Sequence, residues 1–519
     1  MQSQSLNNQR IAKNTILLYF RMFLTMIVTL YTSRIVLNVL GVEDFGIYNV
    51  VGGVVTMFTF INSAMAGATQ RFLTFELGKQ NLVKLHNVFC TSIGIHVLIS
   101  LLIFILAETV GLWFMNTYMS IPPERMDAAY WVFQFSVFSA IVMIMSVPYN
   151  ALIIAHEKMS AFAYISILEV LLKLAIVYVL LIVNTDKLKL YAVLLFCIQL
   201  FIRLIYGRYC NKNFTESRYK LFNDKKLFVE MTSFATWSLF GNLSSVAFTQ
   251  GVNILLNMFF GPVVNAARAV AVQVQSAVLS FVYNFQIALN PQITKNYATG
   301  DYKQLHLLIF ASGRYSYYLL FLLSLPIVFE TNYILTLWLG EVPEHTVNFL
   351  RLILCIMLVD ALANPLITAA SATGKIKIYQ SVIGSILLMI VPISYIVLKL
   401  GAQPESVFIV HFIMIVMAQV ARLFIIRPMI KLSLFRYFKE VVIKVILVTF
   451  VSIVLPLCVT LYFSFVNDFI RFVSVSFACI FSTLISVYYW GIGNEEREFI
   501  IDKKNKIKHK MFKNDSIVE

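Results

Sequence analysis

The chain has 519 residues, of which 59% are hydrophobic and only 13% are charged. This composition excludes a soluble globular protein and indicates a polytopic membrane protein without room for a soluble catalytic domain. The formal charge of +15 does not indicate nucleic-acid binding, because the Lys and Arg residues fall in short loops and in the tail, where membrane topology places them.

Apolar segments, separated by clusters of Gly, Pro, Asn and charge, predict about fourteen membrane-spanning helices. They span residues 14–38, 45–69, 87–110, 129–153, 160–183, 189–209, 230–258, 264–290, 307–330, 346–370, 377–399, 405–427, 440–463 and 467–490. The first segment follows Arg10 and Lys13 as in a signal peptide. It is too long and lacks a small-residue cleavage site, so we expect it to remain as the first helix.

Basic residues alternate between the predicted loops. The even-numbered loops hold most of them, for example Lys158 and Lys375, whereas odd-numbered loops such as LGVED after Asn38 are poor in them. Cytoplasmic loops carry the Lys and Arg excess, so we expect both termini in the cytoplasm. The lysines of the tail would then face anionic lipid, as a topology anchor rather than a specific lipid site.

Two sequence matches predict an internal repeat. Pro148 and Pro365 lie 217 residues apart, and each is followed ten residues later by a lysine. Gly41 and Gly261, each preceded by a Leu-Asn pair, lie 220 residues apart. The matches predict two six-helix lobes in one orientation, with a central cavity suited to alternating-access transport. The expected parts are residues 1–210 and 229–430 as lobes, 211–228 as a basic linker, 431–490 as an additional helix pair and 491–519 as a basic tail.

The sequence contains no GxSxG, HExxH, Walker A or dinucleotide-binding motif. Its six cysteines lie mostly in apolar runs without CxxC spacing, which favours neither disulfides nor a metal site. We therefore expect a protein that is not an enzyme and that has no catalytic residue, metal or cofactor.

Two arginines lie inside predicted helices at comparable depth. Arg34 is in the outward half of the first helix, and Arg268 is near the outward start of the eighth. Such a charge is costly in hydrocarbon and is usually kept where it faces protein, water or an anion. If both line the cavity, their guanidinium groups can hold a phosphate or pyrophosphate. The alternative is that each side chain snorkels to the outer headgroups.

Other polar residues inside the helices are weaker candidates. Glu169 and Lys173 are four residues apart on one helix face and can pair with each other, while Asp360 needs a partner, a proton or a bound cation and is a candidate for ion coupling. For Arg21, Arg203 and Arg422, snorkelling to the cytoplasmic face is the expected arrangement. Candidate cavity residues, besides the Glu169–Lys173 pair, are Arg351, Gln250, Asn253, Asn257 and Gln273. The amides suit sugar hydroxyls, although they can also join helices.

The run TLYTSRIVLNVLGVEDFGIYNVVGG, the lobe ends PYNALIIAHEK and PLITAASATGK, and the fourteen-helix layout resemble the polysaccharide flippases of the multidrug/oligosaccharidyl-lipid/polysaccharide exporter superfamily, in particular the O-antigen or capsule repeat-unit translocases. The resemblance implies an all-α protein of the bacterial inner membrane that moves an undecaprenyl-pyrophosphate-linked oligosaccharide to the periplasmic leaflet. It implies cavity cations at Arg34 and Arg268. The additional helix pair is similar to one that forms a lipid-tail groove in related peptidoglycan-precursor flippases.

Two other functions remain open. A cation-coupled multidrug exporter would share this architecture but would favour acidic cavity residues, and a polysaccharide polymerase or ligase would more often carry a large outer loop. The expected partners of a flippase are the lipid-linked oligosaccharide and membrane lipids. The sequence leaves the energy source open between H⁺, Na⁺ and no ion. We expect a monomer that does not bind nucleic acid.

Overall fold

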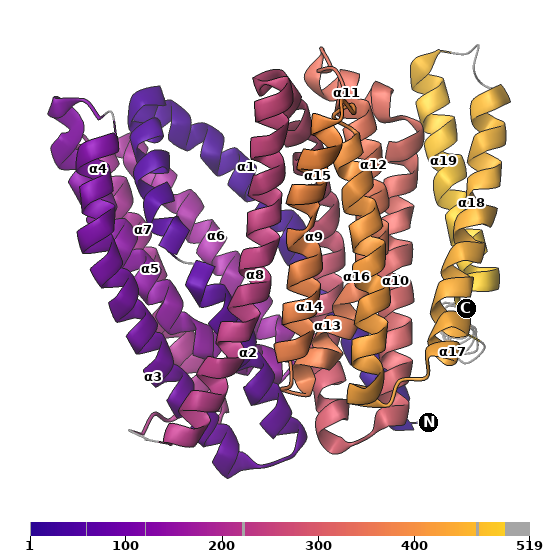
Figure 1. The fold of residues 1–519 in the computed structure, drawn as a ribbon. Helices are drawn as coiled ribbons and strands as arrows, with labels where there is room; N and C mark the ends of the chain where they lie inside the picture. The colour runs from indigo at the N-terminus through magenta and orange to yellow at the C-terminus, as the bar shows by residue number, and fades with distance from the viewer. Residues whose placement is uncertain (1, 59, 120, 221–223, 463–466, 494–519) are drawn as a thin grey trace, which may run out of the picture. The chain divides into compact units, whose positions relative to one another are not determined.

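The computed structural model describes residues 2–58, 60–119, 121–220, 224–462 and 467–493. Every regular element in these ranges is a helix, and no strand occurs in them (Figure 1). The all-α prediction is therefore confirmed for the described part. The physical reason is that a helix satisfies all its backbone hydrogen bonds within one segment, as hydrocarbon requires.

The described part of the N-terminal half contains seven α-helices of 19 or more residues, and four shorter helical segments extend or connect them. They are α1 (Gln2–Phe58), α2 (Phe60–Gly78), α3 (Leu82–Leu106) with its continuation η1 (Ala107–Gly111) and α4 (Leu112–Tyr118), η2 (Pro123–Arg125), α5 (Met126–Ala155), α6 (Met159–Ile182), α7 (Lys187–Asn213), η3 (Thr215–Ser217) and α8 (Lys225–Phe260).

The described helices of the C-terminal half are interrupted more often. They are α9 (Pro262–Thr299), α10 (Tyr302–Phe329), α11 (Thr331–Leu339), α12 (Thr346–Asp360), α13 (Ala363–Ala372), α14 (Lys377–Leu388), α15 (Ile390–Lys399), α16 (Ser406–Ile430), α17 (Leu434–Tyr437), η4 (Phe438–Val442), α18 (Ile443–Tyr462), α19 (Asp468–Ser486) and η5 (Val487–Gly491).

Twelve helices in the described residues are long and apolar enough to cross a membrane. They match the predicted third to fourteenth helices one to one, and the total of about fourteen is not confirmed. The first two predicted helices fall in α1 and α2, and the outer turn LGVED is not a loop. It is a kink within α1 at Gly41, where φ is 80° and ψ is 167°. The chain bends there because glycine adopts a positive φ without steric cost.

Left-handed backbone conformations recur at equivalent places in the two halves. The pairs are Gly41 and Gly261, Gln80 and Gly300, and Glu157 and Gly374. The first two pairs are 220 residues apart and the third is 217 apart, which are the offsets of the sequence repeat. Two of these pairs fall within the repeated motifs, and the Gln80 pair was not recognised from the sequence. A positive φ at matched turns supports an internal repeat, because it fixes the direction in which each helix turns into the next.

The chain forms two compact units, which we describe separately. Unit 1 contains Met1–Ala247, Asn284–Leu305 and Ile367–Ser385, and unit 2 contains Phe248–Tyr283, His306–Leu366 and Ile386–Glu519. Fully buried side chains such as Leu73, Phe89 and Leu152 form the core of unit 1, and Leu256, Phe349 and Leu354 are part of that of unit 2. The predicted boundaries of the lobes stay a prediction.

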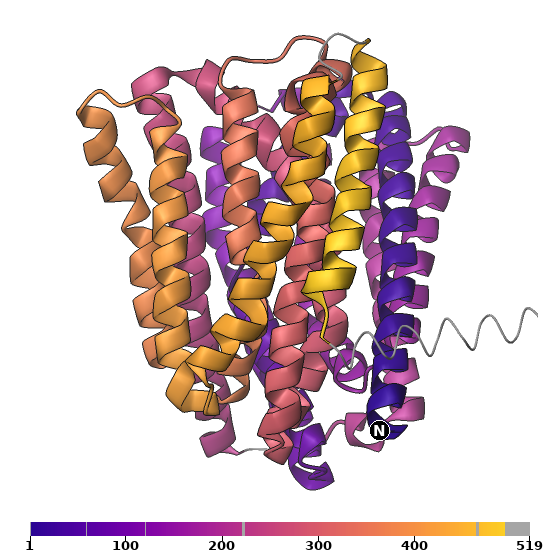
Figure 2. The same cartoon turned by 90° about the vertical axis from the view of Figure 1, so that its right-hand side faces the viewer.

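In unit 2, α18 and α19 lie side by side in both views (Figures 1 and 2). The hydroxyl of Ser482 on α19 donates to the carbonyl of Ser452 on α18 over 2.8 Å. This hairpin is the predicted additional helix pair. Of the predicted basic tail at 491–519, residues 494–519 lie outside the described part.

Candidate functional site

The structure describes the side chain of only one of the two predicted cavity arginines, Arg268. Arg34 lies in α1, on the N-terminal side of the kink at Gly41, and its side chain lies outside the described part of the structure. Arg268 lies in the first two turns of α9 and is only 8% exposed. The geometry of the candidate site therefore starts from Arg268.

Arg268 is held against α8. Its Nη1 donates to Oδ1 of Asn253, and its Nη2 donates to the carbonyl of Thr249 over 3.2 Å. Asn253 in turn donates through Nδ2 to Oε1 of Gln250 over 3.1 Å. The buried Nε of Arg268 has no hydrogen-bond partner among the described residues. The side chain thus lies between two helices of unit 2 rather than extending away from them.

No carboxylate in the described part of unit 2 is paired with Arg268. His411 on α16 lies close enough to interact with the guanidinium electrostatically, and the ring of Phe248 packs edge-on against His411 at 4.9 Å. A buried arginine without a counter-ion is costly, because the desolvation of the charge is not offset by an opposite charge. This arrangement would favour an anion next to the guanidinium.

Of the predicted amides, only Gln250 and Asn253 join this network. Asn257 and Gln273 are exposed, and the described residues provide neither side chain with a hydrogen-bond partner. The spacing of Asn253 and Asn257 put them on one helix face, but contact with Arg268 depends on where α9 crosses α8. The sequence did not indicate Thr249, because it takes part through its backbone.

Unit 1 contains a second polar cluster between apolar helices. Glu169 on α6 accepts from Nζ of Lys173 at 2.6 Å and from Nε2 of Gln199 on α7 at 3.0 Å. The predicted Glu169–Lys173 pair is therefore confirmed as a contact, and whether it lines a transport cavity stays a prediction. Gln199 was missed, although an isolated amide in an apolar run is a recognisable signal.

Arg21 of α1 is bonded to α6 and α9 within unit 1. It donates to Oγ of Ser166 over 3.4 Å and to Oδ1 of Asn284 over 3.2 Å, and it lies over the ring of Phe162. The prediction that it snorkels is wrong, because its donors bind side chains of α6 and α9. Ser166 stands three residues before Glu169, so Arg21 and the ion pair face the same side of α6.

Arg422 also differs from its prediction. It is 4% exposed and donates to Oε1 of Gln419 over 2.5 Å within α16, so it does not snorkel. The guanidinium carbon of Arg203 lies 3.9 Å from the centroid of the Tyr149 ring. The prediction that Arg203 snorkels stays a prediction.

Asp360 is the last residue of α12 and is exposed. Its carboxylate has no hydrogen-bond partner among the described residues, and Arg422 is the charge that acts on it most. Arg351 on the same helix donates through Nε to the carbonyl of Val328 over 3.1 Å and to Oγ1 of Thr331 over 3.2 Å. Arg351 therefore binds the junction of α10 and α11, and the ion-coupling role of Asp360 stays a prediction.

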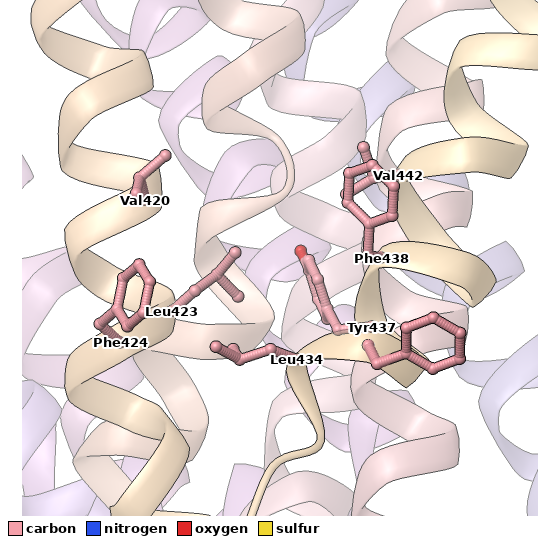
Figure 3. Close-up of a pocket in the computed structure, with 8 residues that line it drawn as sticks. Val420, Leu423, Phe424, Leu434, Tyr437, Phe438 and Val442 are labelled. Carbon is pink, nitrogen blue, oxygen red and sulfur yellow. The ribbon is translucent and has the colours of Figure 1, made fainter.

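An apolar groove lies between α16 and the segment that leads into α18 (Figure 3). Leu423 and Phe424 of α16 stand on one side, and Tyr437 and Phe438 stand on the other. Phe424 and Phe438 are 61% and 54% exposed. In a membrane this surface would face acyl chains, because hydrocarbon solvates exposed aromatic and aliphatic side chains.

A family model described as "Polysaccharide biosynthesis protein" matches residues 11–297, which is more than half of the chain. No curated protein matches the chain by sequence.

Solved structures of transporters match most of the chain. An outward-facing multidrug resistance MATE family transporter of the MOP superfamily is 14% identical with a TM-score of 0.69, and the match covers 82% of this chain and 96% of that one. A MATE structure in the bent conformation is 12% identical with a TM-score of 0.71, covering 82% and 96%. A MOP superfamily transporter from Pyrococcus furiosus, described as having a binding pocket of reverse polarity, is 12% identical with a TM-score of 0.69 and the same coverage. At these identities the matches establish the fold alone.

Proposed function

Because the chain belongs to the family of polysaccharide biosynthesis proteins, we propose that it is a membrane transporter for surface polysaccharide assembly. In this proposal it moves an undecaprenyl-pyrophosphate-linked oligosaccharide from the cytoplasmic to the periplasmic leaflet of a bacterial inner membrane. Its helices and its MATE-like fold supply the scaffold.

The observation that carries the proposal is the buried Arg268 without a paired carboxylate among the described residues. A cationic drug would be repelled by this guanidinium, whereas a pyrophosphate would neutralise it. The planar guanidinium can hold phosphate oxygens through charge-assisted hydrogen bonds.

We assign roles along the lipid-linked substrate. Arg268 binds the pyrophosphate, and Arg34, by its matched position in the sequence, contributes a second cation. Gln250 and Asn253 lie next to Arg268, so their amides would meet the first sugar hydroxyls. The polyprenyl chain stays in the lipid phase, where the apolar groove beside α16 offers a surface for it.

The transport step needs no covalent chemistry. Movement of the lobes exposes the headgroup site to one side and then the other, as in alternating access. Asp360 is the proposed coupling residue, because a carboxylate without a hydrogen-bond partner in the described part can take up H⁺ or Na⁺.

The test uses cells in which this gene is the source of export. Arg268→Ala should abolish surface polysaccharide and make lipid-linked repeat units accumulate inside, while the variant stays in the membrane at the normal level. Arg268→Lys, which keeps the charge but loses the planar fork, should retain part of the activity. Arg208→Ala, at an exposed arginine of α7, is the matched control and should export normally. Full export by Arg268→Ala would remove this residue from the site.

Two other functions make different predictions. A multidrug exporter of the same fold predicts that deletion raises drug susceptibility without accumulation of lipid-linked sugars. A polymerase or ligase predicts that single repeat units still reach the outside. Accumulation inside without a drug phenotype is the result that a flippase requires.

A further inference from the structure

Two segments from the C-terminal half of the sequence belong to unit 1. They are Asn284–Leu305, which contains the end of α9, and Ile367–Ser385, which contains the end of α13 and most of α14. The alternation of basic loops predicts that these ends are cytoplasmic. Within unit 1, the end of α13 is bonded to α2, and the end of α9 is bonded to the turn between α5 and α6.

Arg71 of α2 holds the end of α13. Its Nε donates to the carbonyl of Ser371 over 3.1 Å and its Nη2 to that of Ala372 over 2.8 Å. These are the last two residues of α13, whose carbonyls lack partners within the helix, and a cation there is favoured by the helix dipole. Arg71 is 9% exposed. A Cβ at Gly374 would lie 2.8 Å from Nη2, so a larger residue there would force the end of the Arg71 side chain to shift.

Glu157 holds the end of α9. It lies in the turn between α5 and α6 and is 7% exposed. Its Oε2 accepts from Nε2 of Gln292 at 2.6 Å, and its Oε1 accepts from Nζ of Lys295 at 2.5 Å. A carboxylate with two such donors forms a strong contact, because the carboxylate itself is shielded from water.

The two contacts are related by the repeat. Glu157 and Gly374 occupy equivalent turns and share a positive φ of 58° and 77°. Arg71 and Gln292 lie within one residue of the 220-residue offset. In each case the end of the second helix of one half binds the turn after the fourth helix of the other half. Phe75 connects Arg71 to the end of α9, which carries Gln292 and Lys295. Its ring centroid lies 4.8 Å from the guanidinium of Arg71 and 6.3 Å from the ring centroid of Tyr297, two residues after Lys295.

We propose that these contacts form a clasp, defined as Arg71 with Ser371 and Ala372, and Glu157 with Gln292 and Lys295, which closes the predicted cytoplasmic entrance. The inference rests on the proposed function, because a substrate headgroup that enters from the cytoplasm requires these helix ends to separate. The repeat relates the two contacts, and the Phe75–Tyr297 contact joins them. They should therefore open together.

The test measures opening directly, without any substrate. Ala372 is fully buried under Arg71, so Ala372→Cys reports when the clasp opens by reacting with a polar maleimide on the purified protein. Glu157→Gln, made at the other contact, should raise the rate of this reaction at least about tenfold, which is the order expected for losing one charge-assisted hydrogen bond. An unchanged rate would overturn the clasp.

A second cysteine separates opening from unfolding. Ala163 is 1% exposed within α6, and Ala163→Cys should stay unreactive when Glu157 is replaced. If both cysteines become reactive, the reaction rates are measured again with Gln292→Ala, which removes only one neutral donor. Faster reaction of Ala372→Cys alone would support the clasp, and an unchanged rate would overturn it. Since the reaction needs no substrate, normal clasp opening with failed export would count against the proposed function and not against the clasp.

Discussion

The guanidinium of Arg125 holds the carboxylate of Asp44 with two hydrogen bonds, of 2.8 Å from Nε and 2.5 Å from Nη2. The same guanidinium donates from Nη1 to Oδ2 of Asp186 over 3.0 Å. Asp186 caps α7 by accepting from the amides of Leu188 and Lys189. One arginine therefore ties the segment after the Gly41 kink in α1 to the starts of α5 and α7.

Arg125→Ala should destabilise the protein by about 1–3 kcal/mol, because two carboxylates lose a common cation and repel each other. The side chains of Arg125 and Asp44 are 28% and 18% exposed, so water compensates part of the loss. The measurement is the thermal unfolding temperature in detergent, with Arg208→Ala as the control. An unchanged temperature would mean that the two aspartates are held by other contacts.

The same cluster should make stability depend on acid. Burial by itself would raise the pKa of Asp186, but hydrogen bonds from Arg125 and from the amides of α7 outweigh it and lower the pKa below its ordinary value. The stabilisation is thus complete above the ordinary pKa of about 4 and is lost as the pH falls through the lowered pKa. As the pH falls below about 4, wild-type protein should lose more thermal stability than Asp186→Asn, which can still cap the helix.

The Glu169–Lys173 pair should show coupling. Glu169→Ala leaves an ammonium among apolar helices, so it should destabilise the protein more than the double replacement Glu169→Ala and Lys173→Ala does. The coupling energy expected for polar contacts between membrane helices is about 1 kcal/mol. A double-mutant cycle on thermal or denaturant unfolding measures it, and additive effects would show that the contact contributes nothing.

The kink at Gly41 and the turn at Gly261 between α8 and α9 require glycine. Alanine at Gly41 or Gly261 must adopt a φ of 80° or 79°, which costs about 1–2 kcal/mol. No neighbouring side chain would clash at either position, so the backbone alone decides the result. Gly46→Ala is the matched control, since it lies in a helix with open space around it and should be neutral or slightly stabilising. Equal effects at all three positions would contradict this account.

Asn253 should matter more for transport than Asn257. Asn253 accepts a hydrogen bond from Arg268, whereas Asn257 is exposed one turn away and has no side-chain partner in the described part. Asn253→Ala should reduce export about tenfold, because it removes the group that orients the guanidinium. The comparison is the rate of surface polysaccharide appearance at equal protein level. A larger loss in Asn257→Ala would place the substrate one turn further along the same face of α8.

Much of the architecture could be predicted because it is encoded locally. The length of an apolar run and the charges that flank it determine a spanning helix, since hydrocarbon thickness and the cost of an unsatisfied backbone act on each segment separately. The Gly41–Gly261 and Pro148–Pro365 matches were visible for the same reason. The bend at Gly41 was not, because a loop and a kinked helix share the same turn residues.

The partners of the charges were decided by the tertiary structure alone. Glu169 and Lys173 are one helical turn apart and could be paired from spacing. Arg71 and Ser371 are 300 residues apart, and Arg21 reaches Asn284 across 263 residues, so only the packing of their helices brings them together. A sequence determines that a charge in the membrane needs a partner, and the fold determines which one it has.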